Sequence, residues 1–403
     1  MDTVETPVDE ASAAVRPGFS LLWVILALAV GSFCIGTTEF VAMGLIQEIA
    51  LDLQVSIPAA GHFSTAYALG VTVGAPVLAI LGAKLSRKTM LLGLMLFYGV
   101  ANGLTALASS PETMLISRFI AGLPHGAYFG IAALVAAELA GRGRRATAIA
   151  QVMMGLTVAN VIGVPFATWL GQTFGWRSGF EFSTSIAFVT ILAVSVFVPR
   201  IPPQATASFR AELAGFKNLD MWLTLAVGAI GFGGMFSVYS YASPILTEYT
   251  GASIKLVPIA LAVFGAGMVI GGLVAGRLAD RHLNRTTVAV LTSSAAAFAL
   301  ASFAVVNLYT AVISFFLVGF TMTGLGVVLQ IRLIDVSGEA QGRAASLNHS
   351  AFNMANALGA YLGGLVISQQ LGWTAPIWLG VVLSLSGLLI FGLALAVEKR
   401  GRA

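Results

Sequence analysis

A glutamate and an arginine stand inside long apolar segments of this chain, where ionisable side chains are costly and mark functional sites. Glu39 is the one acid well inside a predicted membrane helix, and Arg118 lies in another such helix. Measured from Glu48 and Glu112, both lie about two helical turns below the same rim. Burial favours the protonated form of a carboxyl group, whereas a nearby positive charge favours the ionised form. We therefore predict that Glu39 carries a proton and that Arg118 biases its protonation.

Polar and aromatic side chains on three predicted helices could line a site beside this pair. His125 and Phe129 share one helix face with Arg118, and a second helix has a stripe of polar residues at i, i+4 and i+7. We predict that the following residues contact a polar substrate: His125, Phe129, Tyr239, Tyr241, His349, Asn353 and Asn356. The alternative role for His125 is helix packing. The alternative role for the polar stripe of His349, Asn353 and Asn356 is interhelical hydrogen bonding, worth about 0.6 kcal/mol on average.

The elements that hold these residues are membrane-spanning helices. The chain is 58% hydrophobic and only 9% charged, which cannot cover a water-facing surface. Its apolar runs are continuous and long enough to cross about 30 Å of hydrocarbon as helices. The net charge of +4 comes from short loops, so no nucleic-acid partner is expected, and the single cysteine, Cys34, excludes a disulfide or a cysteine metal cluster.

The apolar pattern predicts an all-α membrane protein of twelve transmembrane helices in two six-helix bundles. The helices are expected near 20–47, 57–82, 89–109, 113–137, 145–171, 180–198, 220–246, 254–276, 286–306, 309–333, 343–369 and 375–397. The expected organisation is a disordered cytoplasmic tail (1–19), an N-terminal bundle (20–198), a cytoplasmic linker (199–219), a C-terminal bundle (220–397) and a cytoplasmic tail (398–403). Eighteen of the 21 Lys and Arg residues lie in one set of loops and tails, and Arg118, Arg177 and Lys255 lie elsewhere. The positive-inside rule therefore places both termini in the cytoplasm.

The two halves resemble each other, which predicts pseudo-symmetry. Gly82–Arg87 ends the second helix and Gly276–Arg281 ends the eighth, while Ala159–Gly163 in helix five matches Ala355–Gly359 in helix eleven at nearly the same offset. Parallel six-helix halves with a site between them are a transporter plan.

The loop after helix eight resembles a signature of the major facilitator superfamily, in which an acid and arginines latch helix ends in one conformation. The resemblance implies a latch of Gly276, Arg277, Asp280, Arg281 and Arg87. Ser86 stands where the family usually has Asp, so the first half should have the weaker latch.

Two further segments carry the same resemblance. Arg118–Gly126 is similar to the family's arginine signature in helix four, and helix five looks like the antiporter signature of proton-driven exporters through Gly155, Gly163, Pro165 and Gly171. A second glycine pair of that signature is missing, and close helix packing is an alternative role for the glycines. Together with Ile35–Phe40 and Pro58–Gly61, these motifs resemble the branch of arabinose-type and sugar-efflux permeases, near chloramphenicol-type and nucleoside exporters.

The resemblance implies a drug:proton antiporter type of protein in the inner (plasma) membrane. We expect proton-coupled export of a sugar, nucleoside or drug by alternating access, by a monomer without cofactor or metal. A proton-coupled importer of a polar solute and a non-transporting receptor remain alternatives. A membrane enzyme is disfavoured because Gly-x-Ser-x-Gly, His-Glu-x-x-His and a phosphate-binding Gly-Lys-Ser/Thr loop are all missing from the sequence.

Overall fold

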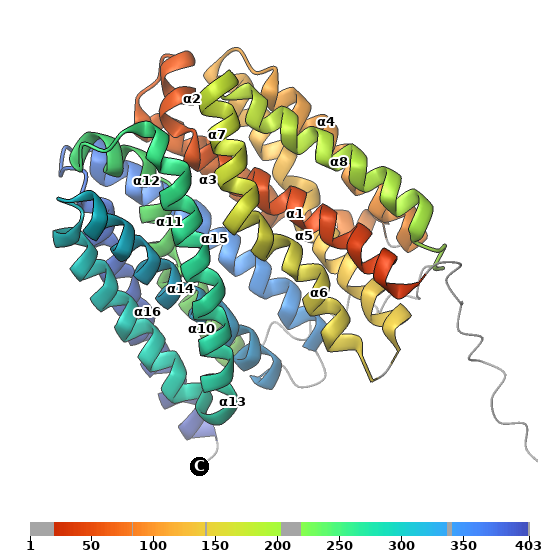
Figure 1. Ribbon diagram of the computed structural model, residues 1–403. Helices are drawn as coiled ribbons and strands as arrows, with labels where there is room; N and C mark the ends of the chain where they lie inside the picture. The colour runs from red at the N-terminus through yellow and green to blue at the C-terminus, as the bar shows by residue number, and fades with distance from the viewer. Residues whose placement is uncertain (1–19, 83, 142, 203–218, 337–340, 402–403) are drawn as a thin grey trace, which may run out of the picture.

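The computed structural model describes residues 20–82, 84–141, 143–202, 219–336 and 341–401, which are helical apart from short connections (Figure 1). The predicted tail 1–19 and most of the predicted linker, residues 203–218, lie outside the described residues. The first half contains α1 (Leu21–Gly44), α2 (Ile46–Asp52), α3 (Ile57–Gly82), α4 (Arg87–Ala106), α5 (Pro111–Ala140), α6 (Arg145–Val158), the π-helical turn η1 (Ala159–Gly163), α7 (Val164–Phe174) and α8 (Arg177–Phe197).

The second half follows the same plan with more interruptions. It contains α10 (Leu219–Ala226), η3 (Val227–Gly231), α11 (Gly233–Tyr239), α12 (Ala242–Pro244), η4 (Ile245–Tyr249), η5 (Ile254–Leu256), α13 (Val257–Ala304), α14 (Leu308–Val336), α15 (Gln341–Ser368) and α16 (Ala375–Gly401).

The described chain supports the predicted set of twelve membrane helices. Ten of its segments are long and apolar enough to span a membrane. One of them, Ile254–Ala304, has 51 residues and contains two predicted helices, and α3 is a further helix of 26 residues outside those ten. Counting α3 and dividing the long segment gives twelve.

Two predicted boundaries differ from the structure. The predicted helix 220–246 is broken into α10, η3, α11, α12 and η4, because π-helical turns and Pro244 interrupt its regular hydrogen bonding. The predicted helices 254–276 and 286–306 both extend further than expected and meet at His282, whose φ of −151° and ψ of 75° are not helical, so α13 consists of two helices with a shorter junction than the sequence predicts.

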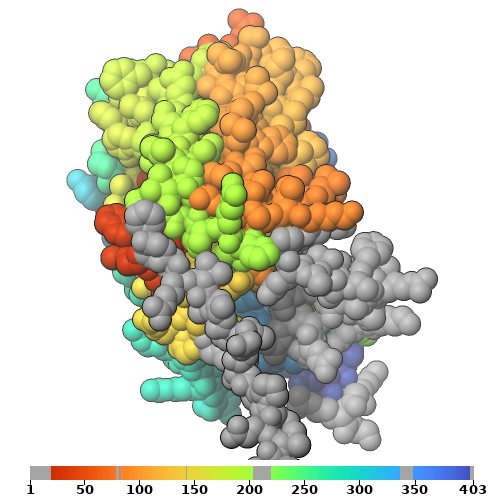
Figure 2. Space-filling view, turned by 90° about the vertical axis from the view of Figure 1, so that its right-hand side faces the viewer, coloured from red at the N-terminus to blue at the C-terminus, as the bar shows by residue number. Residues whose placement is uncertain are grey.

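The two halves form two bundles that lie side by side (Figure 1). One buried apolar cluster lies wholly within the first bundle, and another contains residues of both, for example Phe40 against Phe236 and Tyr239. Figure 2 shows α8 lying along α4 on the surface of the first bundle. Large apolar side chains there are exposed, including Leu96 and Val100 of α4 and Leu192 of α8. A surface of this kind suits lipid rather than water.

The end of the molecule that carries α2, here called the α2 end, joins the bundles to each other. Gln47 of α2 donates to Thr247 Oγ1 at 2.8 Å and to Glu248 Oε1 at 3.2 Å, and Ser243 donates to Gln47 Oε1 at 2.7 Å. Nearby, Gln172 donates to the Ile254 carbonyl oxygen at 3.2 Å. These contacts close the two bundles against each other at the α2 end.

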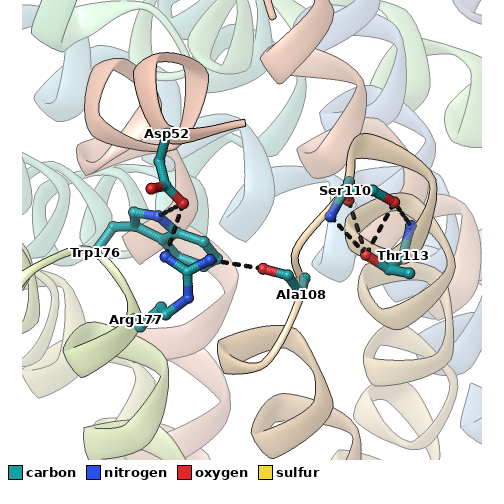
Figure 3. Close-up of polar contacts among 6 residues, drawn as sticks. All are labelled: Asp52, Ala108, Ser110, Thr113, Trp176 and Arg177. Atoms are coloured by element: carbon teal, nitrogen blue, oxygen red, sulfur yellow. Dashed lines mark hydrogen bonds and ion pairs between the residues drawn. The ribbon is translucent and has the colours of Figure 1, made fainter. Parts of the chain in front are cut away.

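A polar clamp reinforces the first bundle at the same end (Figure 3). Asp52 accepts a 2.7 Å hydrogen bond from Arg177 and a 3.0 Å bond from Trp176 Nε1, and Arg177 also donates to the Ala108 carbonyl oxygen. The Arg177 guanidinium, with the Trp176 indole, holds the pKa of Asp52 below its usual range. The clamp ties α2 to the loops before α5 and α8.

The opposite end is held by ion pairs within each bundle. Arg87 pairs with Glu138 in the first bundle, and Arg332 pairs with Glu398 at 3.2 Å in the second. Between the two ends α13 crosses η1 so closely that a side chain on Gly265 would collide with the Asn160 carbonyl oxygen. This crossing is the tightest kind of contact, backbone against backbone.

Candidate functional site

Glu39 lies where the two bundles meet. Its side chain is only 8% exposed, and Asn356 of α15 donates a hydrogen bond from Nδ2 to Glu39 Oε1 at 3.1 Å. Glu39 belongs to the first bundle and Asn356 to the second. The carboxyl group is therefore part of the contact between them, and its charge affects that contact.

Arg118 of α5 is fully buried close to Glu39. Its Nη2 donates to the Thr38 carbonyl oxygen at 3.4 Å, and its guanidinium lies 4.2 Å from the centre of the Tyr67 ring and 5.5 Å from that of Phe180. Within the described residues, Arg118 and Glu39 form no ion pair. The positive charge of Arg118 therefore acts on the Glu39 carboxyl group through space.

Several polar atoms around Glu39 have no hydrogen-bond partner within the described part of the chain. They are Arg118 Nε and Nη1, the Tyr239 hydroxyl and Asn356 Oδ1. Buried polar groups are normally hydrogen-bonded, so such a concentration of free donors and acceptors requires water or a ligand. The structure thus brings four predicted residues, Glu39, Arg118, Tyr239 and Asn356, to one polar site between the bundles.

A column of rings leads from Arg118 to the second bundle. The Tyr67 hydroxyl is 2.9 Å from His125 Nδ1 and 3.0 Å from the Tyr98 hydroxyl. The His125 ring lies 5.2 Å from that of Phe129, which stacks on His349 of α15 at 5.6 Å with an interplanar angle of 10°. His125, Phe129 and His349 are therefore one connected group rather than three separate side chains.

The other two predicted substrate contacts are engaged in helix packing. Tyr241 donates to the Ala360 carbonyl oxygen at 2.8 Å and lies against Gly61 of α3 and Gly364 of α15. Asn353 donates to the His349 carbonyl oxygen at 3.0 Å in its own helix, and its Oδ1 has no partner within the described residues. Asn353 thus keeps a free acceptor within the described residues, whereas the Tyr241 hydroxyl is used in a hydrogen bond to α15.

The predicted antiporter-type residues lie in the predicted fifth helix, which is α6, η1 and α7 in the structure, and they set how closely it approaches α1. A side chain on Gly155 would meet the Ala29 carbonyl oxygen, one on Gly163 would meet Thr37, and one on Gly171 would meet Leu45. Pro165 follows the π-helical turn η1 directly. The glycines therefore hold α1, which carries Glu39, against helix five.

The predicted latch residues are not gathered in this conformation. Asp280 and Arg281 are exposed, as is Arg277, which donates to the Leu273 carbonyl oxygen of its own helix. Gly276 is half-buried on the same helix, and Arg87 is buried in the other bundle beside Glu138. No ion pair of Asp280 occurs within the described residues.

Comparison with known proteins agrees with this architecture. The sequence model of the Major Facilitator Superfamily matches residues 28–249 and 224–403. The chain belongs to the major facilitator superfamily. This superfamily member is 39% identical over 368 residues to the inner membrane transport protein YdhP of Escherichia coli strain K12, covering 91% of this chain and 95% of YdhP. It is also 31% identical over 373 residues to a chloramphenicol resistance protein of Streptomyces lividans, covering 90% and 94% of the two chains.

A solved structure has the same fold as this major facilitator protein. It is a bacterial homologue of the human lysosomal transporter Spinster, in an inward-facing and occupied conformation, with a TM-score of 0.74 and 17% identity. The match covers 93% of this chain and 96% of the other. The predicted fold, two pseudo-symmetric bundles of six helices, is confirmed.

Sequence reasoning missed several polar partners in this superfamily member. Tyr67 and Tyr98 are fully buried next to His125, and Glu138 and Glu398 neutralise Arg87 and Arg332. A signal was available for the tyrosines, since a tyrosine inside an apolar helix usually needs a hydrogen-bond partner for its hydroxyl.

Proposed function

We propose that the protein exports a small molecule in exchange for protons, by alternating access, with Glu39 as the proton carrier. One observation carries the proposal: a buried carboxyl group, Glu39, accepts a hydrogen bond from Asn356 of the other bundle, beside the positive charge of Arg118. Protonation of this one group acts directly on the contact between the bundles. It can therefore couple proton exchange to their movement.

The contacts at the α2 end support a direction for the cycle. With both termini in the cytoplasm, as the loop charges predict, the α2 end faces outward. The present arrangement is then closed to the outside and faces inward. We propose that substrate binding in this arrangement favours proton release from Glu39 to the cytoplasm, and that Glu39 takes a proton from outside after the α2 end opens.

The membrane potential can drive this cycle. One proton moving through 100 mV supplies about 2.3 kcal/mol, in addition to the pH gradient. The acid that exchanges this proton must lie in the membrane, and Glu39 is the only one well inside a predicted span.

The free hydrogen-bonding groups at the site fit a polar or amphipathic substrate. Asn353, Asn356 and Tyr239 each have a polar atom without a partner in the described part of the chain, and the aromatic rings of Phe129 and His349 stack on each other. Because relatives include an inner membrane transport protein and a chloramphenicol resistance protein, we propose an inner-membrane location and a substrate among drugs of the chloramphenicol type, nucleosides or sugars. We propose that the protein acts as a monomer.

The first experiment identifies a substrate and the second tests the proton carrier. Counterflow in proteoliposomes is measured for the three substrate classes, which separates transport from mere binding. The Glu39→Gln variant should then bind substrate but lose pH-driven export, because an amide has no proton to exchange. Glu39→Asp is the matched control and should retain part of the pH-driven export. Continued export against a gradient by Glu39→Gln would place the coupling site elsewhere.

A further inference from the structure

Tyr67 of α3 lies against Arg118 and near Glu39, the two charged residues of the site. Its ring is fully buried and lies 4.2 Å from the Arg118 guanidinium, and the Tyr67 side chain interacts electrostatically with both Arg118 and Glu39. Neither the sequence signatures nor the proposed mechanism assigns Tyr67 a role.

The position of the guanidinium is unusual for a cation beside an acid. Arg118 keeps Nε and Nη1 without hydrogen-bond partners within the described residues, although the Glu39 carboxyl is near. A desolvated cation over an aromatic face is attracted to the ring by the negative charge of that face. The Tyr67 ring therefore competes with Glu39 for the guanidinium.

A hydrogen-bond chain fixes the Tyr67 ring in this position. Tyr98 donates to the Ile35 carbonyl oxygen at 3.3 Å, which uses its only hydroxyl proton. Tyr67 must then donate to Tyr98, and His125 Nδ1 must donate to Tyr67, across contacts of 3.0 and 2.9 Å. The Tyr67 hydroxyl is thus held from two sides, by α4 and by α5.

We propose that Tyr67 is a positioning residue that holds the Arg118 guanidinium on its ring and away from Glu39. Without the ring, Arg118 would move to the carboxylate and form an ion pair, which favours the ionised acid. Tyr67 thereby keeps Glu39 able to hold a proton. The inference rests on the proposed function only for its consequence in transport, since the effect on Glu39 itself can be measured without substrate.

The test follows the protonated Glu39 carboxyl directly. Infrared difference spectra of the purified full chain in detergent are titrated with pH, and the carbonyl band of Glu39 is identified by its absence in Glu39→Gln. Tyr67→Leu removes the ring, and Tyr67→Phe keeps the ring but removes its hydroxyl anchor. Each change is also made in an Arg118→Gln background, because coupling between neighbouring residues appears as non-additivity.

We expect Tyr67→Leu to weaken proton binding by Glu39 about tenfold, a shift of about one pH unit to lower pH. Tyr67→Phe should give a smaller shift in the same direction, of about threefold. In the Arg118→Gln background, neither Tyr67→Leu nor Tyr67→Phe should move the midpoint of the Glu39 titration any further. An unmoved midpoint in both variants, or equal shifts with and without Arg118, would overturn the inference; if Tyr67→Leu does not fold, Tyr67→Phe decides by the same criteria.

The same spectra separate this inference from the proposed function. If the Glu39 band titrates and shifts as expected, but substrate addition to wild-type protein releases no protons, Tyr67 positions Arg118 and the export mechanism is wrong. If substrate does release protons through Glu39 while the Tyr67 variants titrate like wild type, the export mechanism stands and the role of Tyr67 is wrong.

Discussion

Removing the charge of Arg118 should move proton release to higher pH. In Arg118→Gln the polar shape is partly kept but the positive charge that favours ionised Glu39 is gone. Glu39 then keeps its proton to a higher pH. This shift is opposite in sign to that expected for Tyr67→Leu, so the two variants together test one electrostatic account.

The size of the shift follows from the geometry. The guanidinium and the carboxyl interact electrostatically but form no ion pair within 4.0 Å. Two unit charges about 4 Å apart at an effective dielectric constant of about 20 interact by about 4 kcal/mol, and charges further apart interact by less. Since one pH unit corresponds to about 1.4 kcal/mol, the shift must be smaller than about three pH units. We expect a shift of about one to two units, because water entering around the smaller glutamine will screen part of the change.

The assay is proton release when substrate is added to the detergent-solubilised protein, followed with a pH indicator dye across a series of starting pH values. Arg118→Lys is the matched control, since it keeps the charge while losing the planar guanidinium, and it should shift the midpoint by less than half as much. A midpoint in Arg118→Gln that stays in place or moves to lower pH would refute the electrostatic role of Arg118.

Two further predictions concern the ends of the molecule. Burial raises the pKa of Glu48 at the α2 end, so the closed arrangement there should become more stable as pH falls through that raised value. Glu48→Gln should keep the α2 end closed at all pH values, which is measured by thiol labelling of Met43→Cys in a Cys34→Ala background. Labelling that remains pH-dependent in Glu48→Gln would contradict this. Asp280 has no ion pair within the described residues in this conformation, so we propose that its latch forms in the outward-facing conformation. Because a charged hydrogen bond is worth about 1.5–3 kcal/mol, Asp280→Asn should slow transport about tenfold or more while leaving substrate affinity intact. A loss of affinity at unchanged turnover would exclude the latch.

The sequence predicts the helices well because the bilayer sets their length. Each apolar run must cross the same thickness of hydrocarbon with its backbone groups paired internally. The interruptions of helix 220–246 escape prediction, since its π-helical turns depend on tertiary packing. The short junction between the two helices of α13 also escapes prediction: the charged residues of 277–285 suggested a loop, whereas the two helices extend from either side to His282.

The candidate site is predictable in part. Glu39 and Arg118 stand out because charge is rare in such segments, and measuring the depth of each from the same rim places them at one level. The structure does bring them close together, since Arg118 donates to the carbonyl oxygen of Thr38, the residue before Glu39. The hydrogen bond from Asn356 to Glu39 and the contact of Tyr67 with Arg118 depend on how each helix is rotated, which spacing along one chain does not fix. Their roles in transport stay predictions.

The crossing of α13 over η1 has a mechanical consequence. Gly265 lies on the Asn160 backbone, and a rigid rotation of the bundles would turn about such a contact. From Gly265 to the start of α13 at Val257 is about 12 Å along the helix, and to the kink at His282 about 25 Å, at about 1.5 Å per residue. Because the second distance is about twice the first, a rotation about Gly265 would displace the end of the helix near His282 about twice as far as its end at the α2 end. If the bundles turn about this contact, the position of this single glycine would make the opening at the α2 end narrower than the opening at the end near His282.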